Sequence, residues 1–552
     1  MSKYLSFLFC ALFLFIVQLY ADNYPKNPGI DILHYRFELI LSDSEDVIKG
    51  NCSINILFKE ESIKEIRLDL INKNNSMEGK GMQVSGVSMK DQSLKYNHRN
   101  NLLTIFLDQP SKVDQEISLT IDYHGIPYSG LKIAPNKYGD RTFFSDNWPN
   151  KARNWLPTVD HPYEKATSEM IVIAPNHYQI VSNGLLVEES NLQNDLKRTH
   201  WKQSVPISCW LYVLGVAEFA IQYVDTFEGK SIQTWVYKQD RDAGFYDFAV
   251  PTKQSLQFFS DYVGPFVYEK LANIQSNSVG GGMEAATAIL YGDKSVTGKR
   301  ETRWRNIIIH EVAHQWFGNA VTEYDWDDVW LSEGFATYFT LLFREHAYGR
   351  EDFVSGLISS RDRVWKFYEK NKNYRIVHDN LSDMNQVTTS NTYQKGAWIL
   401  HMLRNLVGKE SFQKGIRNYY LRYLNSHAST EDFKNEMEKV SGMDLDNFFD
   451  QWLYNGGHIV LDGSWEFDSK KKEISIHLEQ VQNSSHLFSF PIEFGIYNEG
   501  EVLPTLVTRK VSEKKFSYSI PAKLKPNRLV IDPRTVLLGT WTFNEKKLII
   551  EQ

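Results

Sequence analysis

The spacing of hydrophobic residues changes twice along this 552-residue chain, and this pattern constrains the fold more than any other feature. From about residue 30 to residue 220, apolar and polar residues alternate, as at Tyr35, Phe37, Leu39 and Leu41. A period of two places successive side chains on opposite faces of a strand. The pattern therefore predicts an N-terminal antiparallel β domain over residues 22–220.

The middle of the chain has a helical pattern. From about residue 245 to residue 453, apolar residues recur at three- and four-residue spacings. Gly456 and Gly457 interrupt this pattern, and alternation returns at Ile474, Ile476 and Leu478. We therefore expect a multidomain α+β protein with a mostly helical domain over residues 221–455 and a C-terminal β-sandwich over residues 456–552.

Composition and charge exclude several classes of protein. With 42% hydrophobic residues the chain can bury large cores, and it has no low-complexity tract. Its 61 basic and 68 acidic side chains are mixed, with a net charge of -7, so we expect no nucleic-acid partner. The three cysteines, Cys10, Cys52 and Cys209, are too few for a disulfide scaffold or a cysteine zinc cluster.

The N-terminus resembles a secretory signal peptide. Lys3 precedes an apolar run from Leu5 to Val17, and Ala21 provides a small residue at a cleavage point. The run is shorter than the roughly 20 residues that span a membrane as a helix. We expect residues 1–21 to direct export to the periplasm or the exterior, with no transmembrane span in the mature chain. An uncleaved anchor is the alternative.

Two histidines four residues apart indicate a metal site. His310 and His314 stand in the apolar run IIIHEVAH (residues 307–314), which fits a helix. Residues i and i+4 share one helix face, so both imidazoles can reach one tetrahedral cation. Glu311 would lie beside that cation as the base for a water molecule. The alternative is a pair of structural helix histidines.

Glu333 is the candidate third ligand. Eighteen residues separate it from His314, and its surroundings predict the start of a second helix. Two histidines and one glutamate leave the fourth position of a zinc ion open, as in catalytic rather than structural sites. A carboxylate at a helix N-terminus is the alternative interpretation.

These motifs resemble the M1 family of zinc aminopeptidases, a gluzincin family. The histidine and glutamate spacing matches, and so do segments 152–157, 261–266 and 448–454. The resemblance covers most of the mature chain. It implies an N-terminal β domain, a thermolysin-like catalytic domain and a β-sandwich, without the helical C-terminal domain of longer members. It also implies one Zn²⁺ per chain and peptide substrates with a free N-terminus; it leaves the oligomeric state open.

The resemblance further implies a substrate-binding strand. Gly281, Gly282, Met283, Glu284 and Ala285 stand where the family carries its Gly-x-Met-Glu-Asn strand. Glycines there would admit an extended peptide, and Glu284 would hold the α-ammonium of the substrate. A flexible turn is the alternative. Ala285 departs from the family asparagine, which removes hydrogen bonds that would brace the strand.

Two further roles rest on the same resemblance. Tyr393, in the run TYQKGAW (residues 392–398), matches the family tyrosine that stabilises the tetrahedral intermediate. A neutral phenol can donate a hydrogen bond to the developing oxyanion. Asp146 falls where relatives often have a glutamine that contacts the amine, and a loop aspartate is the alternative.

The expected activity is therefore removal of the N-terminal residue from peptides, with Glu311 as general base. Two other zinc hydrolase activities on the same scaffold, endopeptidase and epoxide hydrolase, are the nearest alternatives. The epoxide alternative is disfavoured because the chain ends after the predicted β-sandwich. An inactive secreted binding protein is the alternative from another class.

Overall fold

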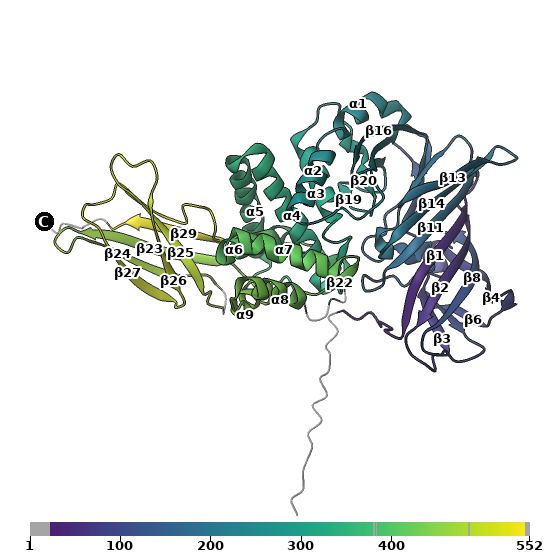
Figure 1. Ribbon diagram of the computed structural model, residues 1–552, viewed down its shortest axis with the longest axis horizontal. Coiled ribbons are helices and arrows are strands. Elements are labelled where there is room, and N and C mark those ends of the chain that lie inside the picture. Colours follow the sequence, from purple (N-terminus) through teal and green to yellow (C-terminus); the bar gives the residue numbers. More distant parts are fainter. Residues whose placement is uncertain (1–21, 379–380, 382, 484–485, 547–552) are drawn as a thin grey trace, which may run out of the picture.

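The computed structural model describes residues 22–546 apart from 379–380, 382 and 484–485. Figure 1 shows an elongated molecule with β-sheets at both ends and helices between them. The predicted signal segment, residues 1–21, lies outside the described residues. Among the helices that are described, none is long and apolar enough to cross a membrane.

The N-terminal β domain contains three sheets. Its eight-stranded sheet has the order β13 (Leu185–Asn191), β14 (Leu196–Ile207), β11 (Ala166–Pro175), β1 (Ile30–Ile40), β2 (Ile48–Phe58), β8 (Gln115–Ile126), β4 (Gly81–Met89) and β5 (Gln92–Ser93). A four-stranded sheet has the order β12 (Gln179–Ser182), β15 (Leu214–Ala217), β10 (Arg141–Ser145) and β9 (Leu131–Pro135). A third sheet contains β3 (Glu65–Asp69), β7 (Leu102–Phe106) and β6 (Tyr96–Arg99).

The large sheet is not wholly antiparallel, in contrast to the prediction. β1 pairs antiparallel with β2 but parallel with β11, from His34 opposite Thr167 to Ile40 opposite Ile173. Parallel neighbours need a long connection, and here the two smaller sheets begin between β1 and β11 in the chain. A period of two is the same for both pairing directions, so the sequence could not distinguish them.

The helical part begins with a mixed five-stranded sheet. Its order is β16 (Phe219–Phe227), β17 (Lys230–Tyr237), β18 (Lys270–Ser276), β20 (Ala288–Gly292) and β19 (Gly282–Met283). The helices are α1 (Arg241–Phe248), α2 (Thr252–Tyr262), α3 (Thr302–His314), α4 (Trp330–Tyr348), α5 (Arg350–Lys370), α6 (Gly396–Val407), α7 (Lys409–Tyr423), α8 (Thr430–Ser441) and α9 (Asp446–Phe449). A small parallel pair, β21 (Val321–Glu323) and β22 (Ser426–Ala428), lies among them.

Helices α3 and α4 pack against each other and carry the predicted metal ligands. α3 buries Ile308, Ile309 and Val312 in the core, which fixes the rotation of the helix about its axis. α4 ends at Gly349, whose φ of 91° falls in a region that favours glycine. Because both helices are anchored by apolar contacts, their polar side chains face each other at fixed positions.

The C-terminal part contains two sheets. One has the order β27 (Lys515–Pro521), β24 (Glu473–Gln480), β23 (Ile459–Asp468) and β29 (Gly539–Glu545), and the other has β26 (Thr505–Val511), β25 (Phe490–Tyr497) and β28 (Arg528–Ile531). Phe494 of the second sheet contacts Phe543 of the first, with ring centroids 6.2 Å apart. These sheets form the end of the molecule opposite the N-terminal domain (Figure 1).

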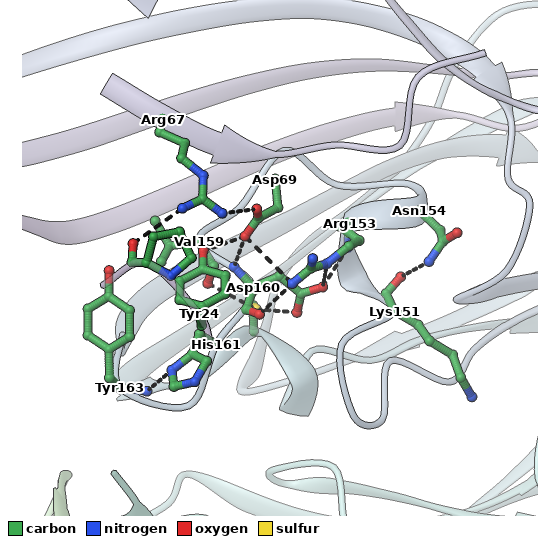
Figure 2. Close-up of polar contacts among 12 residues, drawn as sticks. Tyr24, Arg67, Asp69, Lys151, Arg153, Asn154, Val159, Asp160, His161 and Tyr163 are labelled. Carbon is green, nitrogen blue, oxygen red and sulfur yellow. Dashed lines mark hydrogen bonds and ion pairs between the residues drawn. The ribbon is translucent and has the colours of Figure 1, made fainter. Parts of the chain in front are cut away.

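A buried polar network ties the loops of the N-terminal domain together (Figure 2). Arg153 Nε donates to Asp160 Oδ2 at 2.8 Å, and the Asp160 backbone N–H donates to Asp69 Oδ2 at 3.0 Å. Asp69 also accepts a hydrogen bond from Arg67. Cys209, a free buried thiol like Cys52, donates to Asp160 Oδ1 at 3.2 Å. The network therefore joins three separate segments of the domain.

Substitution of Asp160 should destabilise the protein strongly. Asp160→Ala leaves the Arg153 guanidinium, whose side chain is only 21% exposed, without its main acceptor. Loss of one partner of a buried ion pair costs about 3–5 kcal/mol, and Asp69 at 3.7 Å from Arg153 offsets part of it, so we expect about 3 kcal/mol. Urea denaturation measures the change. Asp46→Ala, at an exposed ion pair with Arg141, should cause little loss, and equal losses would contradict this role.

Candidate active site

The predicted metal ligands His310, His314 and Glu333 lie together between α3 and α4. His310 Nε2 is 3.1 Å from His314 Nε2 and 3.3 Å from Glu333 Oε2, and His314 Nε2 is 3.2 Å from the same oxygen. Two atoms that bind one zinc tetrahedrally at 2.0–2.1 Å are separated by about 3.3–3.4 Å. The three atoms therefore form a triangle of the size that a zinc ion requires.

The orientation of His314 is fixed by its second ring nitrogen. His314 Nδ1 donates to the Phe317 carbonyl oxygen at 3.0 Å, and Ser332 Oγ lies 3.1 Å from the same nitrogen. Because a carbonyl oxygen can only accept, the proton sits on Nδ1 and Nε2 keeps a lone pair toward the site. Such a partner sets the tautomer and the ring orientation of a metal-ligating histidine.

Three buried carboxylates surround the histidines. Burial and the nearby Glu284 raise the pKa of Glu311 well above its usual value. Burial also raises the pKa of Glu284, to about 7, against the opposing effect of His314. Burial opposes ionisation of Glu333, but His314 and His310 outweigh it and lower its pKa to about 2. Burial and mutual repulsion thus oppose simultaneous ionisation of these carboxyl groups, and a bound cation would favour their charged forms.

Tyr393 reaches the same site from a different element. It lies on the π-helical turn Asn391–Lys395 that precedes α6, and its hydroxyl donates to Glu333 Oε1 at 2.6 Å. Its ring stacks near His310 at a centroid distance of 6.1 Å. Burial and Glu333 raise its pKa well above 10, so the phenol stays protonated as a hydrogen-bond donor.

Strand β19 places Gly282 and Met283 at the edge of the five-stranded sheet, where a further strand can pair. At Gly281 no atom would contact an added Cβ within 4 Å. At Gly282 a Cβ would lie 2.1 Å from Glu311 Oε1, so any larger residue here would displace the Glu311 carboxylate. Met283 and Ala285 are buried, and β19 packs against α3.

Glu284 points its carboxylate into the site. Its Oε1 is buried without a hydrogen-bond partner among the described residues and lies 4.0 Å from His314 Nδ1. Two side chains that follow α3 in the chain hold its backbone: Gln315 Nε2 and Asn319 Nδ2 donate to the Glu284 carbonyl oxygen at 3.0 and 2.7 Å. Neither residue was predicted from the sequence, although Gln315 directly follows His314 in the chain.

Asp146 follows β10 in the N-terminal domain. Its Oδ2 lies 3.0 Å from Lys151 Nζ, and its backbone N–H donates to the Gly130 carbonyl oxygen. Its charge contributes to the raised pKa of Glu284, after burial and the effects of His314 and Glu333. The structure therefore brings Asp146 within electrostatic range of Glu284. Asp146 also forms an ion pair with Lys151, which offsets part of its charge.

A second group of possible metal ligands is already paired with positively charged and protonated groups. Asp22, His161 and Asp325 lie within 4.8 Å of one another. The Lys26 ammonium lies between the carboxylates, 2.9 Å from Asp325 Oδ2 and 3.3 Å from Asp22 Oδ1. His161 Nδ1 accepts a hydrogen bond from the Tyr163 N–H, so its proton sits on the nitrogen that faces Asp22. A cation and a proton thus occupy the positions that a metal would need.

Comparison with known proteins identifies the family. The Peptidase family M1 domain matches residues 248–452, and the Peptidase M1 N-terminal domain matches residues 32–211. The chain belongs to the M1 peptidase family. This M1 chain contains the His310, His314 and Glu333 triangle within the region matched by the first of these domains.

Several curated aminopeptidases are similar to this M1 chain. It is 30% identical over 329 residues to glutamyl aminopeptidase of Rattus norvegicus, covering 57% of this chain and 35% of the relative. It is 26% identical over 475 residues to the Homo sapiens enzyme of that name, covering 80% and 48%. Probable aminopeptidase 2 of Sulfurisphaera tokodaii is 28% identical, with 69% and 49% covered. The chain spans about a third to a half of the length of these relatives.

Solved structures share the fold. An M1 zinc metallopeptidase from Deinococcus radiodurans has a TM-score of 0.64 at 24% identity, covering 77% of this chain and 93% of that one. A mutant of that protein bound to a Tyr-Ser-Ala substrate has a TM-score of 0.66 at 24% identity. These matches support an N-terminal β-rich domain followed by a helical domain.

Proposed function

We propose that this protein is a zinc-dependent aminopeptidase that removes the N-terminal residue from peptides. The proposal rests on one observation: beside the His310, His314 and Glu333 triangle, Glu284 Oε1 is buried and has no hydrogen-bond partner among the residues that the structure describes. A buried carboxylate without a partner is costly. A substrate ammonium would satisfy it, which favours peptides with a free N-terminus.

The charge of the site fits the binding of one zinc ion together with one substrate ammonium. Glu284, Glu311 and Glu333 together carry three negative charges when ionised, next to two imidazoles. A zinc dication and one substrate ammonium supply three positive charges. Buried charges persist when they are paired, so this balance favours simultaneous binding of both cations.

Each side chain has one task in the proposed reaction. Zinc held by His310, His314 and Glu333 would supply a Lewis acid that activates water and polarises the peptide carbonyl. Glu311 accepts the proton of the attacking water and passes it to the leaving amine. Tyr393 donates a hydrogen bond to the carbonyl oxygen as negative charge develops there.

The substrate is held by the neighbouring strand. Glu284 binds the α-ammonium, Asp146 adds negative charge from the N-terminal domain, and the peptide pairs with residues 281–285 as an edge strand. Because the ammonium site and the catalytic residues are fixed relative to each other, only the first peptide bond reaches Glu311.

A pair of substrates tests the activity directly. We expect hydrolysis of aminoacyl fluorogenic amides, including alanyl and glutamyl amides, and negligible hydrolysis of their N-acetylated forms. The glutamyl amide is included because two of the relatives described above are named glutamyl aminopeptidases. Equal rates on free and acetylated substrates would favour an endopeptidase, and an absence of turnover with bound zinc would favour a binding protein.

Glu284→Gln should specifically weaken binding of the free amine. The amide keeps the size of the side chain but loses the charge that pairs with the ammonium, and a charged hydrogen bond of this kind is worth about 10- to 100-fold in affinity. KM for an aminoacyl amide should rise by that factor with the zinc content unchanged. An unaltered KM would contradict the assignment of Glu284.

Tyr393→Phe should mainly lower kcat. Removal of one donor to a developing oxyanion costs about 100-fold or more, whereas the ground-state complex loses little. Steady-state kinetics separate the two parameters. A change confined to KM would show that Tyr393 acts in substrate binding instead. Tyr419→Phe, at a buried tyrosine on α7 outside the site, is the control and should retain activity.

Three further proposals concern organisation and location. We infer domain boundaries near residues 220 and 455, since β16 already pairs with the sheet of the helical part and β23 begins at Ile459. The ring contact between the two C-terminal sheets supports a β-sandwich. The apolar run before Ala21 supports export to the periplasm or exterior.

A further inference from the structure

The backbone that carries Glu284 is held from the N-terminal β domain. Asn183 Nδ2 donates to the Ala286 carbonyl oxygen at 2.6 Å, and the Gly184 N–H donates to Thr287 Oγ1 at 2.8 Å. The Asn183 amide is itself oriented, because its Oδ1 accepts a hydrogen bond from the Val213 N–H. Two residues that follow β12 therefore hold the Ala286 carbonyl and the Thr287 side chain, two and three residues beyond Glu284.

These contacts hold Thr287 in a backbone conformation that threonine does not favour. Its φ is 67°, a left-handed conformation that β-branched residues rarely adopt. Such a residue persists only when its surroundings fix it. Here Gln315 Oε1 accepts from the Thr287 N–H at 3.0 Å, and Lys270 Nζ donates to its hydroxyl at 3.3 Å. The turn after Glu284 is therefore set by tertiary contacts.

A second contact from the β domain reaches Glu284 through Asn319. Lys165 Nζ, just before β11, donates to the carbonyl oxygens of Asn319 and Ala320 at 2.9 and 3.1 Å. Asn319 in turn donates to the Glu284 carbonyl oxygen. Through Asn319, the β domain thus also helps to hold the peptide carbonyl of Glu284 itself.

We propose that Asn183, Thr287 and Lys165 are positioning residues that aim the Glu284 carboxylate at the substrate ammonium. We call these contacts the interdomain clamp. The inference rests on the proposed aminopeptidase function. The clamp also explains how the strand tolerates Ala285, which lacks the side-chain amide that the family resemblance implies at this position: the bracing hydrogen bonds come from the neighbouring domain.

A pair of inhibitors isolates this role. An α-amino hydroxamate and its des-amino analogue should both bind zinc, and only the first presents an ammonium to Glu284. The ratio of their dissociation constants, measured by calorimetry as well as inhibition, reports the ammonium site alone. We expect the wild-type protein to prefer the amino compound by about 10- to 100-fold, the value of one charged hydrogen bond.

Loss of the clamp should reduce that preference. Asn183→Ala and Thr287→Val should each lower the ratio by about 10-fold, while affinity for the des-amino analogue and zinc content stay constant. Thr287→Ser retains the hydroxyl and should restore most of the ratio. Thr234→Val is the control, because the Thr234 hydroxyl is buried in the same sheet as β19 without a hydrogen-bond partner among the described residues.

The outcomes separate the clamp from the proposed function. If the wild-type preference persists in both Asn183→Ala and Thr287→Val, the clamp is overturned and the aminopeptidase proposal stands. If both inhibitors lose affinity equally, the residues act on overall stability and the clamp is again overturned. A wild-type protein that binds zinc but shows no preference for the amino compound contradicts the proposed function, and the clamp with it.

Discussion

Glu311→Gln should lower kcat by about a thousandfold or more and leave the zinc content of the protein unchanged. General-base catalysis by a positioned side chain contributes roughly a hundred- to ten-thousandfold, and the Glu311 carboxylate lies beside both Gly282 of β19 and the ligand His314. The amide keeps the volume of the side chain, so its contact with Gly282 is preserved. Steady-state kinetics and elemental analysis of the same preparation provide the test.

The control for this variant is Glu436→Gln. Glu436 is also a buried glutamate, but it lies on α8 and pairs with Lys439 and Arg422 away from the site. It should retain activity near the wild-type value. Substantial turnover by Glu311→Gln with zinc in place would show that Glu311 is not the general base and that another group accepts the proton.

His314→Ala should abolish both zinc binding and activity. His314 provides one corner of the ligand triangle and is the most buried of the three ligands, with a side chain only 1% exposed. Loss of a residue that merely orients a ligand costs roughly 10- to 100-fold in metal affinity, so loss of the ligand itself should cost more. Zinc titration against a chelator measures the affinity.

His401→Ala is the matched control for the metal prediction. His401 is a buried histidine on α6 that contacts Tyr338 and the Thr535 carbonyl oxygen. Its replacement should lower stability but leave one zinc per chain. Retention of zinc at wild-type affinity by His314→Ala would contradict the ligand assignment, even if activity were lost.

Some parts of the site could be predicted from local sequence and others could not. His310 and His314 share a helix face, so their spacing alone indicated that both could bind one metal ion. Tyr393 lies sixty residues beyond Glu333 in the chain, and only the family resemblance pointed to it. Asn183 and Lys165 act through side-chain contacts with another domain, and no local pattern signals such contacts.

The fold shows the same division. Alternation at β1 and β2 predicted strands correctly because one face of each is buried. β18 and β20 are buried along their whole length, so they lack alternation, and the sequence interpretation did not place a five-stranded sheet at the start of the helical part. The parallel pairing of β1 with β11 depends on the path of the chain between them.

One zinc ion should bind between α3 and α4, held by His310, His314 and Glu333. Diffraction from crystals of the full-length protein on both sides of the zinc absorption edge tests it most directly. We expect a single strong anomalous peak within bonding distance of His310 Nε2, His314 Nε2 and the Glu333 carboxylate. No peak there, or a peak instead among Asp22, His161 and Asp325, would contradict it.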